Sequence, residues 1–159
     1  MSNLTTLTVI TALIGSALIS GVFFAFSSFI MKALERRPAL EGIAAMKSIN
    51  VVVINPIFLG LFMGTTVICL IISIIAIAEW QMPAASYFLV GSLFYIVGTF
   101  LVTGLGNVPL NNQLAAVKEH DLDAVEVWHN YLKKWTRLNT IRSVCAMMAT
   151  LIMLVGIMK

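Results

Sequence analysis

Apolar residues fall along this chain in four long, unbroken blocks that are separated by polar stretches. Each block holds roughly 20 residues or more, the length that a helix needs to cross the hydrocarbon core of a bilayer. The blocks do not alternate between apolar and polar positions, so they predict transmembrane helices and not the strands of a barrel. The four predicted spans are residues 4–31, 51–78, 84–105 and 141–158.

The pattern predicts an all-α fold, a transmembrane four-helix bundle in which residues 1–159 form a single integral membrane domain. We expect Pro38 to open the second helix, which continues into the second span with a kink near Val52 because Pro56 removes a backbone donor. Asn55 either satisfies the backbone opened by Pro56 or serves a site at the membrane boundary. Both interpretations stay open at this point.

The segment TGLGNVPLNNQL is polar for this chain. Its two glycines are expected to end the third helix after Leu105. Asn107 and Pro109 then suit the cap and first turn of a short extra helix, with Asn111 one turn further on. The fourth helix is expected to be long and to begin well before its span.

The first span carries small residues at four-residue intervals, at Ala12, Ser16 and Ser20. Such a ridge favours close packing inside the bundle, and a homodimer face is the alternative. Further along, the segment FFAFSSF, residues 23–29, either lines a pocket for a flat ligand or packs at the membrane interface.

Composition and charge agree with a membrane protein. The chain is 60% hydrophobic and 11% charged, and a soluble domain carries about twice that charge. The net charge of +3 does not indicate nucleic-acid binding, because nine of the ten basic residues lie in two loops, four in residues 32–50 and five in residues 106–142. The positive-inside rule places the loops 32–50 and 106–140 in the cytoplasm and both termini on the outer side.

The segment LDAVEVWHNYLKKWTRLNTIRS predicts an unusual helix face. At about 100° per residue, five residues share a sector roughly 80° wide. They are Trp128, Tyr131, Trp135, Asn139 and Arg142. An ordinary core face would carry Leu, Ile and Val, so this stripe of indoles, phenol, amide and guanidinium predicts one wall of a polar pocket. We call these five residues the α-stripe.

Arg142 lies just inside the fourth predicted span, where a charge is costly and usually faces a cavity, an acid or a ligand. The alternative is that its long side chain reaches back to the nearby membrane surface. Because Arg142 shares its face with Asn139 and Trp135, we favour the cavity. Guanidinium, amide and indole donors suit a developing oxyanion or a carbonyl-bearing ligand.

His129 is the histidine nearest this predicted pocket and the obvious general base, although a simple surface histidine is the alternative. Glu126 and His129 form one Glu-x-x-His unit. Carboxylate-bridged metal sites in helical bundles need two such units and two further acids. The sequence therefore predicts no metal site.

Four sequence elements occur in order over roughly residues 21–143: FFAFSSFIMKAL, MKSINVVVINPIF, TGLGNVPLNNQL and WHNYLKKWTRLNTIRS. Together they resemble the anthrone oxygenase-like family of small four-span bacterial membrane proteins. The more specific motif, Asn-x-Pro-x-Asn, then Trp, then Trp-x-x-x-Asn-x-x-Arg, is matched by Asn107, Pro109, Asn111, Trp128, Trp135, Asn139 and Arg142. A Met-x-x-Ile-Asn element is matched by Met46, Ile49 and Asn50.

The resemblance implies a cofactor-independent oxygenase of the bacterial inner membrane that oxidises the activated methylene of an anthrone to a quinone with molecular oxygen. A deprotonated polyphenol can reduce oxygen itself, so the protein would remove a proton, stabilise the oxyanion and hold the rings. On this basis the catalytic candidates are His129, Arg142, Asn139 and Asn111. The ligand-binding candidates are Trp128, Tyr131, Trp135, Asn107 and Asn50.

Two functions stay open. The first is an oxidoreductase acting on an anthrone-, quinol- or polyphenol-like aromatic, with molecular oxygen and membrane lipid as further partners. The second is a non-enzymatic membrane protein in which the α-stripe binds a lipid or small ligand or organises the loop. A homo-oligomer is compatible with both. A proton-coupled transporter is disfavoured because the predicted spans contain no Asp or Glu.

Overall fold

Five helices make up 87% of the chain in the computed structural model, which describes residues 2–118 and 120–159. The first joins α1 (Asn3–Ala25), a π-helical turn η1 (Phe26–Ile30) and α2 (Met31–Glu35). Two separate helices follow, α3 (Ala39–Val52) and α4 (Pro56–Ala78). The next joins α5 (Ala85–Tyr95), the π-helical segments η2 (Ile96–Leu101) and η3 (Thr103–Asn107), and α6 (Val108–Ala116). The last is α7 (Ala124–Ile157).

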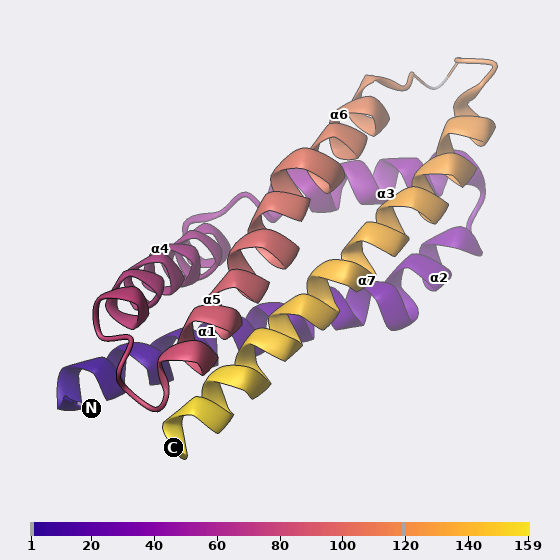
Figure 1. Cartoon of the computed structure of the whole chain (residues 1–159). Coiled ribbons are helices and arrows are strands. Elements are labelled where there is room, and N and C mark those ends of the chain that lie inside the picture. Colours follow the sequence, from indigo (N-terminus) through magenta and orange to yellow (C-terminus); the bar gives the residue numbers. More distant parts are fainter. Residues whose placement is uncertain (1, 119) are drawn as a thin grey trace.

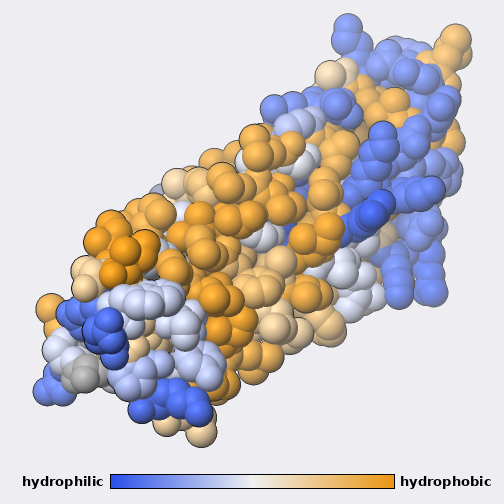
Figure 2. Space-filling view, in the orientation of Figure 1, coloured by the Kyte–Doolittle hydropathy of each residue, from blue (hydrophilic) through white to orange (hydrophobic). Residues whose placement is uncertain are grey.

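Four of these helices are long and apolar enough to cross a membrane, namely Asn3–Glu35, Pro56–Ala78, Ala85–Ala116 and Ala124–Ile157. They run side by side, with both termini at one end of the bundle and α3 at the other, which we call the α3 end (Figure 1). A broad apolar belt lies between polar ends (Figure 2). The all-α prediction is therefore confirmed, and the chain is a multi-pass membrane protein.

The centre of the bundle is packed through small residues. α7 lies along α1 and α5, and α4 packs on the same two helices. Ala12 and Ser16 of α1 are fully buried, and Ser20 exchanges hydrogen bonds with Ser143 through hydroxyls and backbone oxygens at 2.9 and 3.1 Å. The predicted small-residue ridge is thus a packing face within the bundle, where close backbone approach replaces the hydrophobic effect that lipid does not supply.

The chain breaks between α3 and α4, where a continuous, kinked helix was predicted. Pro56 occupies the first turn of α4, where a missing N–H costs nothing, so it starts a new helix. The Asn55 amide oxygen accepts from the Phe58 N–H at 3.0 Å, and its amide nitrogen donates to the Val52 carbonyl at 2.9 Å. The predicted role of Asn55 in satisfying the opened backbone is confirmed. The helix that forms the second candidate span begins at Pro56, five residues after the predicted start at residue 51.

The third helix continues through the glycines that were predicted to end it. Gly104 and Gly106 belong to η3, and Asn107 has helical dihedral angles, φ −69° and ψ −38°, without a capping hydrogen bond. The prediction of a helix end after Leu105 is therefore wrong, and the short extra helix of the bundle is α3. Gly106 instead lets η3 approach α7, since an added Cβ would lie 2.9 Å from Leu138.

We expect Gly15→Leu to destabilise the bundle, because a Cβ at Gly15 would collide with the Thr65 side chain where α1 crosses α4. Overpacking of this kind costs about 1–3 kcal/mol of unfolding free energy. Gly21→Leu, in the same helix but with open space around it, is the matched control and should change little. Thermal unfolding in detergent measures both, and equal effects would show that the α1–α4 contact is not tight.

Candidate functional site

The α-stripe lies on one buried face of an unbroken helix. α7 continues from Ala124 to Ile157 without interruption. All five stripe residues are at most 5% exposed: Trp128, Tyr131, Trp135, Asn139 and Arg142. Exposed polar residues occupy the opposite side, at Asn130, Lys133, Lys134 and Arg137. The predicted helix face is confirmed, and it points into the bundle.

The three rings of the α-stripe form a stack, and two of them are hydrogen-bonded to α6. The Trp128 and Tyr131 rings are 5.8 Å apart, and those of Tyr131 and Trp135 are 6.0 Å apart. The Tyr131 hydroxyl and the Trp135 indole N–H both donate to the Asn111 side-chain oxygen, at 2.9 and 2.8 Å. Asn111 therefore serves as the common acceptor that holds α6 against α7.

Asn139 connects the α-stripe to the first helix. Its side-chain amide donates to the Phe23 carbonyl and to the Ser27 hydroxyl, both at 2.7 Å. Its oxygen accepts from the Arg142 guanidinium at 2.6 Å. Since Asn139 is fully buried and uses both ends of its amide, it orients Arg142 and fixes the start of η1 against α7.

Arg142 is a buried cation whose partners are neutral. It is 4% exposed, and it donates to the Thr103 hydroxyl at 3.1 Å and to Asn139. Its Cζ lies 4.0 Å from the centre of the Phe23 ring and 5.4 Å from that of Trp135, over the faces of both. Within residues 2–118 and 120–159 the one ion pair joins Arg37 to Glu41 at the surface. Arg142 thus lacks a carboxylate partner in the described part of the chain.

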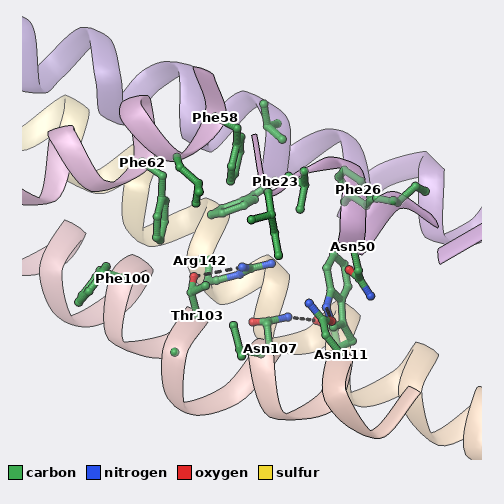
Figure 3. Close-up of a pocket in the computed structure, with 18 of the residues that line it drawn as sticks. Phe23, Phe26, Asn50, Phe58, Phe62, Phe100, Thr103, Asn107, Asn111 and Arg142 are labelled. Carbon is green, nitrogen blue, oxygen red and sulfur yellow. Dashed lines mark hydrogen bonds between the residues drawn. The ribbon is translucent and has the colours of Figure 1, made fainter. Parts of the chain in front are cut away.

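A cavity of about 360 Å³ lies beside Arg142. This volume is within the range of small-ligand pockets. Its polar lining consists of Asn50, Thr103, Asn107, Asn111 and Arg142. Its aromatic lining consists of Phe23, Phe26, Phe58, Phe62, Phe100 and Trp135, so rings from several helices line the same cavity as the guanidinium (Figure 3).

Two polar groups at the cavity are left without partners. Asn107 is 1% exposed and donates to the Trp135 carbonyl at 3.2 Å, but its side-chain oxygen accepts no hydrogen bond. The Arg142 Nε also makes none. Buried polar groups are usually satisfied, so an unpaired donor and an unpaired acceptor at one cavity are unusual. The pair suits a ligand that presents an oxyanion or carbonyl together with a hydroxyl group.

The π-helical segments help to form this cavity. η1, η2 and η3 contribute Phe26, Phe100 and Thr103 to the lining, and η3 also contributes Gly104 and Asn107. π-helical turns often occur at functional sites, because the extra residue in the turn shifts the side chains that follow it. Three such segments around one cavity mark it as the candidate site.

The site residues that were predicted from the sequence fall into three groups in the structure. Arg142, Asn111, Asn107, Asn50 and Trp135 line the cavity. Trp128, Tyr131 and Asn139 are not part of its lining and support those that are. His129 is exposed, on the far side of α7 from the stripe, and does not line the cavity.

Sequence reasoning missed Thr103 and the phenylalanines of α4 and η2. Thr103 stands directly before the TGLGN glycines and could have been included with that motif. Phe58, Phe62 and Phe100 carry no local signal, because aromatic residues in a span resemble ordinary core packing. Phe23 and Phe26 belong to the FFAFSSF segment, for which a pocket lining was one of two interpretations, and both residues line the cavity. Over the described residues, no group of three or more His, Cys, Asp or Glu side chains could hold a metal ion.

Comparison with known proteins gives one match. A family model described as Anthrone oxygenase matches residues 58–152, from the first turns of α4 into the second half of α7. The matched region contains Thr103, Asn107, Asn111, Trp135 and Arg142. No curated protein and no solved structure matches the chain.

We expect Asn111→Leu to lower the free energy of unfolding by about 2 kcal/mol, because two buried donors, the Tyr131 hydroxyl and the Trp135 indole N–H, would lose their shared acceptor. Asn112→Leu is the matched control, since Asn112 is exposed and adjacent in sequence. Denaturant unfolding in detergent micelles compares the two variants. Equal stability of both would contradict the role of Asn111 as the link between α6 and α7.

Proposed function

The chain belongs to the anthrone oxygenase family, and on this premise we propose that it oxidises a small anthrone-, quinol- or polyphenol-like aromatic with molecular oxygen in the cavity beside Arg142. The observation that carries the proposal is a buried guanidinium without a carboxylate partner in the described residues, surrounded by aromatic rings. A cation in that setting stabilises negative charge on a flat ligand far more strongly than it would in water.

The reaction on an anthrone-type substrate balances with molecular oxygen as the oxidant. The methylene loses a proton, and the resulting anion delocalises its charge onto the ring oxygen. Electron transfer to O₂ and formation of a C–O bond give a peroxide anion at the former methylene carbon, which takes up a proton from solvent to become a hydroperoxide. Loss of water from this hydroperoxide leaves a carbonyl, so one oxygen atom enters the quinone and the other leaves as water.

Arg142 acts on the first of these steps. Its guanidinium binds the ring oxygen on which charge develops, and Asn139 and Thr103 hold it in place. The unpaired oxygen of Asn107 accepts from a ring hydroxyl and fixes the orientation of the substrate. The rings of Phe23, Phe26 and Trp135 provide the apolar faces against which flat rings pack.

The proton is expected to leave to solvent. His129 is exposed and outside the cavity, and none of the described His, Asp or Glu side chains lines it. Binding of the anion by Arg142 favours ionisation of the substrate, because each unit by which its pKa falls corresponds to about 1.4 kcal/mol of preferential binding to the anion. The protein therefore promotes proton loss mainly by stabilising the product of that step.

The orientation of the protein in the membrane is part of the same proposal. Exposed lysines and arginines gather at the α3 end, in the loop after α2 and on the outer face of the first half of α7. The positive-inside rule then directs the α3 end to the cytoplasm of a bacterial inner membrane, with both termini outside. A homo-oligomer stays a prediction.

A second candidate is a non-enzymatic protein that binds the same kind of ligand. The exposed position of His129 favours it, because the cavity then has no side-chain base of the usual kind among the described residues. The two functions differ in one measurement: a binding protein would take up an anthrone without consuming oxygen.

We expect Arg142→Ala to reduce the oxygen consumption of proteoliposomes supplied with anthrone at least about 100-fold, the usual effect of removing an oxyanion donor. Arg142→Lys keeps the charge but loses the planar set of donors, so its rate should be intermediate. Arg137→Ala is the matched control, because Arg137 is exposed on the other face of the same helix. An unchanged rate in correctly inserted Arg142→Ala would refute the role of the guanidinium.

We expect His129→Ala to retain the wild-type rate within about twofold, like a surface substitution, because its side chain lies outside the cavity. The rate should rise about tenfold per pH unit below the pKa of the bound substrate, since the reactive form is its anion. A histidine base would instead make the rate level off near neutral pH. Oxygen consumption between pH 6 and 9, with His120→Ala as the control, tests this. If His129→Ala lost activity and His120→Ala did not, His129 would be the general base.

A further inference from the structure

A second hydrophobic core lies next to the cavity, on the side of the α3 end, and shares Met46 and Trp135 with its lining. This core consists of Met31, Ile43, Met46, Leu114, Ala124, Trp128, Tyr131, Leu132 and Trp135, all at most 8% exposed. It lies between the cavity and the polar loops, and Asn111 ties it together through Tyr131 and Trp135.

The cavity is open on its side, between the start of α4 and the η3–α6 segment. Exposed lining residues stand on both sides of this opening: Ile54 (69%), Leu59 (39%) and Met63 (45%) on one side, and Gly104 and Val108 (41%) on the other. Val22 of α1 (37%) is a further exposed lining residue. α4 packs on α1, α5 and η2, whereas η3 packs on η2, α6 and α7. Phe58 in the first turns of α4 lies on the opposite side of the cavity from Thr103 and Asn107 of η3 (Figure 3).

This side opening lies at the depth of the bilayer. α7 ends at Ile157, which places Arg142 about 22 Å along the axis from that end at about 1.5 Å per residue. Measured from that end, a hydrocarbon core about 30 Å thick would contain Arg142, and the cavity would reach the α3-end boundary of the core, where Ile54 precedes the candidate span Pro56–Ala78. The rim residues are apolar, and on the face shown in Figure 2 an apolar belt lies between the polar ends of the bundle. The opening therefore faces lipid.

We propose that the substrate enters the cavity sideways from the bilayer, between α4 and the η3–α6 segment, and is a lipid-soluble hydroxyaromatic that can carry an alkyl chain. The inference rests on the proposed function for the oxygen-bearing ring and extends it to the class of substrate. The ring oxygens lie against Arg142 and Asn107, the rings fill the aromatic part of the cavity, and the chain leaves through the opening into the surrounding lipid.

Gly104 borders the side opening and has no side chain that would narrow it. A Cβ added there would meet nothing within 4 Å, so the space in front of it is open. A bulky side chain at Gly104 would therefore occupy the opening without displacing any packed neighbour. Val108 lies one helical turn further on and lines the same opening.

The test measures binding of two unreactive probes to the full chain in phosphatidylcholine vesicles: 2-methylanthraquinone and 2-dodecylanthraquinone. Saturable quenching of tryptophan emission reports occupancy, because Trp135 lines the cavity. The wild type should bind both probes with affinities within about threefold. Gly104→Phe or Val108→Phe should weaken the dodecyl probe at least about tenfold more than the methyl probe. Gly60→Phe is the matched control, since Gly60 also has open space but does not line the cavity, and it should bind both probes like the wild type.

The proposal is overturned if the wild type rejects the dodecyl probe, or if neither Gly104→Phe nor Val108→Phe discriminates against it. Because neither probe turns over, these outcomes are independent of oxygenase activity. If the protein binds both probes but does not consume oxygen with anthrone, the proposed function is refuted and the proposal of a side opening stands. An active protein that rejects the dodecyl probe would keep the function and refute the opening.

Discussion

A buried guanidinium that has no carboxylate partner among the described residues is the constraint on which the rest of this structure depends. Burying an ion costs several kcal/mol even after the protein relaxes. Arg142 meets that cost with the hydroxyl of Thr103, the amide oxygen of Asn139 and the faces of two rings. These partners come from α1, η3 and α7, so satisfying the cation also determines how these helices approach one another. Its remaining Nε is unpaired, and in the proposed function it is a free donor for an electron-rich ligand.

The polar residues around this cation divide into a layer that lines the cavity and a layer that holds the first in place. Asn139 uses both ends of its amide within the protein, and Asn111 accepts from two rings at once. Asn107 is different, because its oxygen is buried and unpaired. Some residues of a polar stripe on a membrane helix therefore serve to join helices. The residues that keep an unpaired donor or acceptor are the better candidates for binding a ligand. By this criterion Arg142 and Asn107 come first, and Asn139 is a positioning residue.

The properties that follow local periodicity could be predicted from the sequence. Long apolar blocks gave the four spans, and the spacing from Trp128 to Arg142 predicted the buried face of α7, because both depend only on the geometry of a single helix. The π-helical segments could not be predicted in this way. Gly104 and Gly106 have the local signature of a helix end, yet both lie within η3, and at Gly106 an added Cβ would lie against Leu138 of α7. The aromatic lining of the cavity also could not be predicted from the sequence, since Phe58, Phe62 and Phe100 come together only when α4 and η2 pack around the cavity.

An opening toward lipid has a consequence for the chemistry that an opening toward water would not have. Electrostatic stabilisation of an anion weakens as the local dielectric constant rises, so water at the mouth would reduce what Arg142 can contribute. Hydrocarbon at the mouth preserves the low dielectric in which a single guanidinium has a large effect. Molecular oxygen is apolar and partitions into the same hydrocarbon, so both reactants of the proposed oxidation can arrive by the route between α4 and the η3–α6 segment. The burial that makes Arg142 costly to the fold is, on this view, the same burial that lets one cation activate an aromatic substrate without a side-chain base beside it.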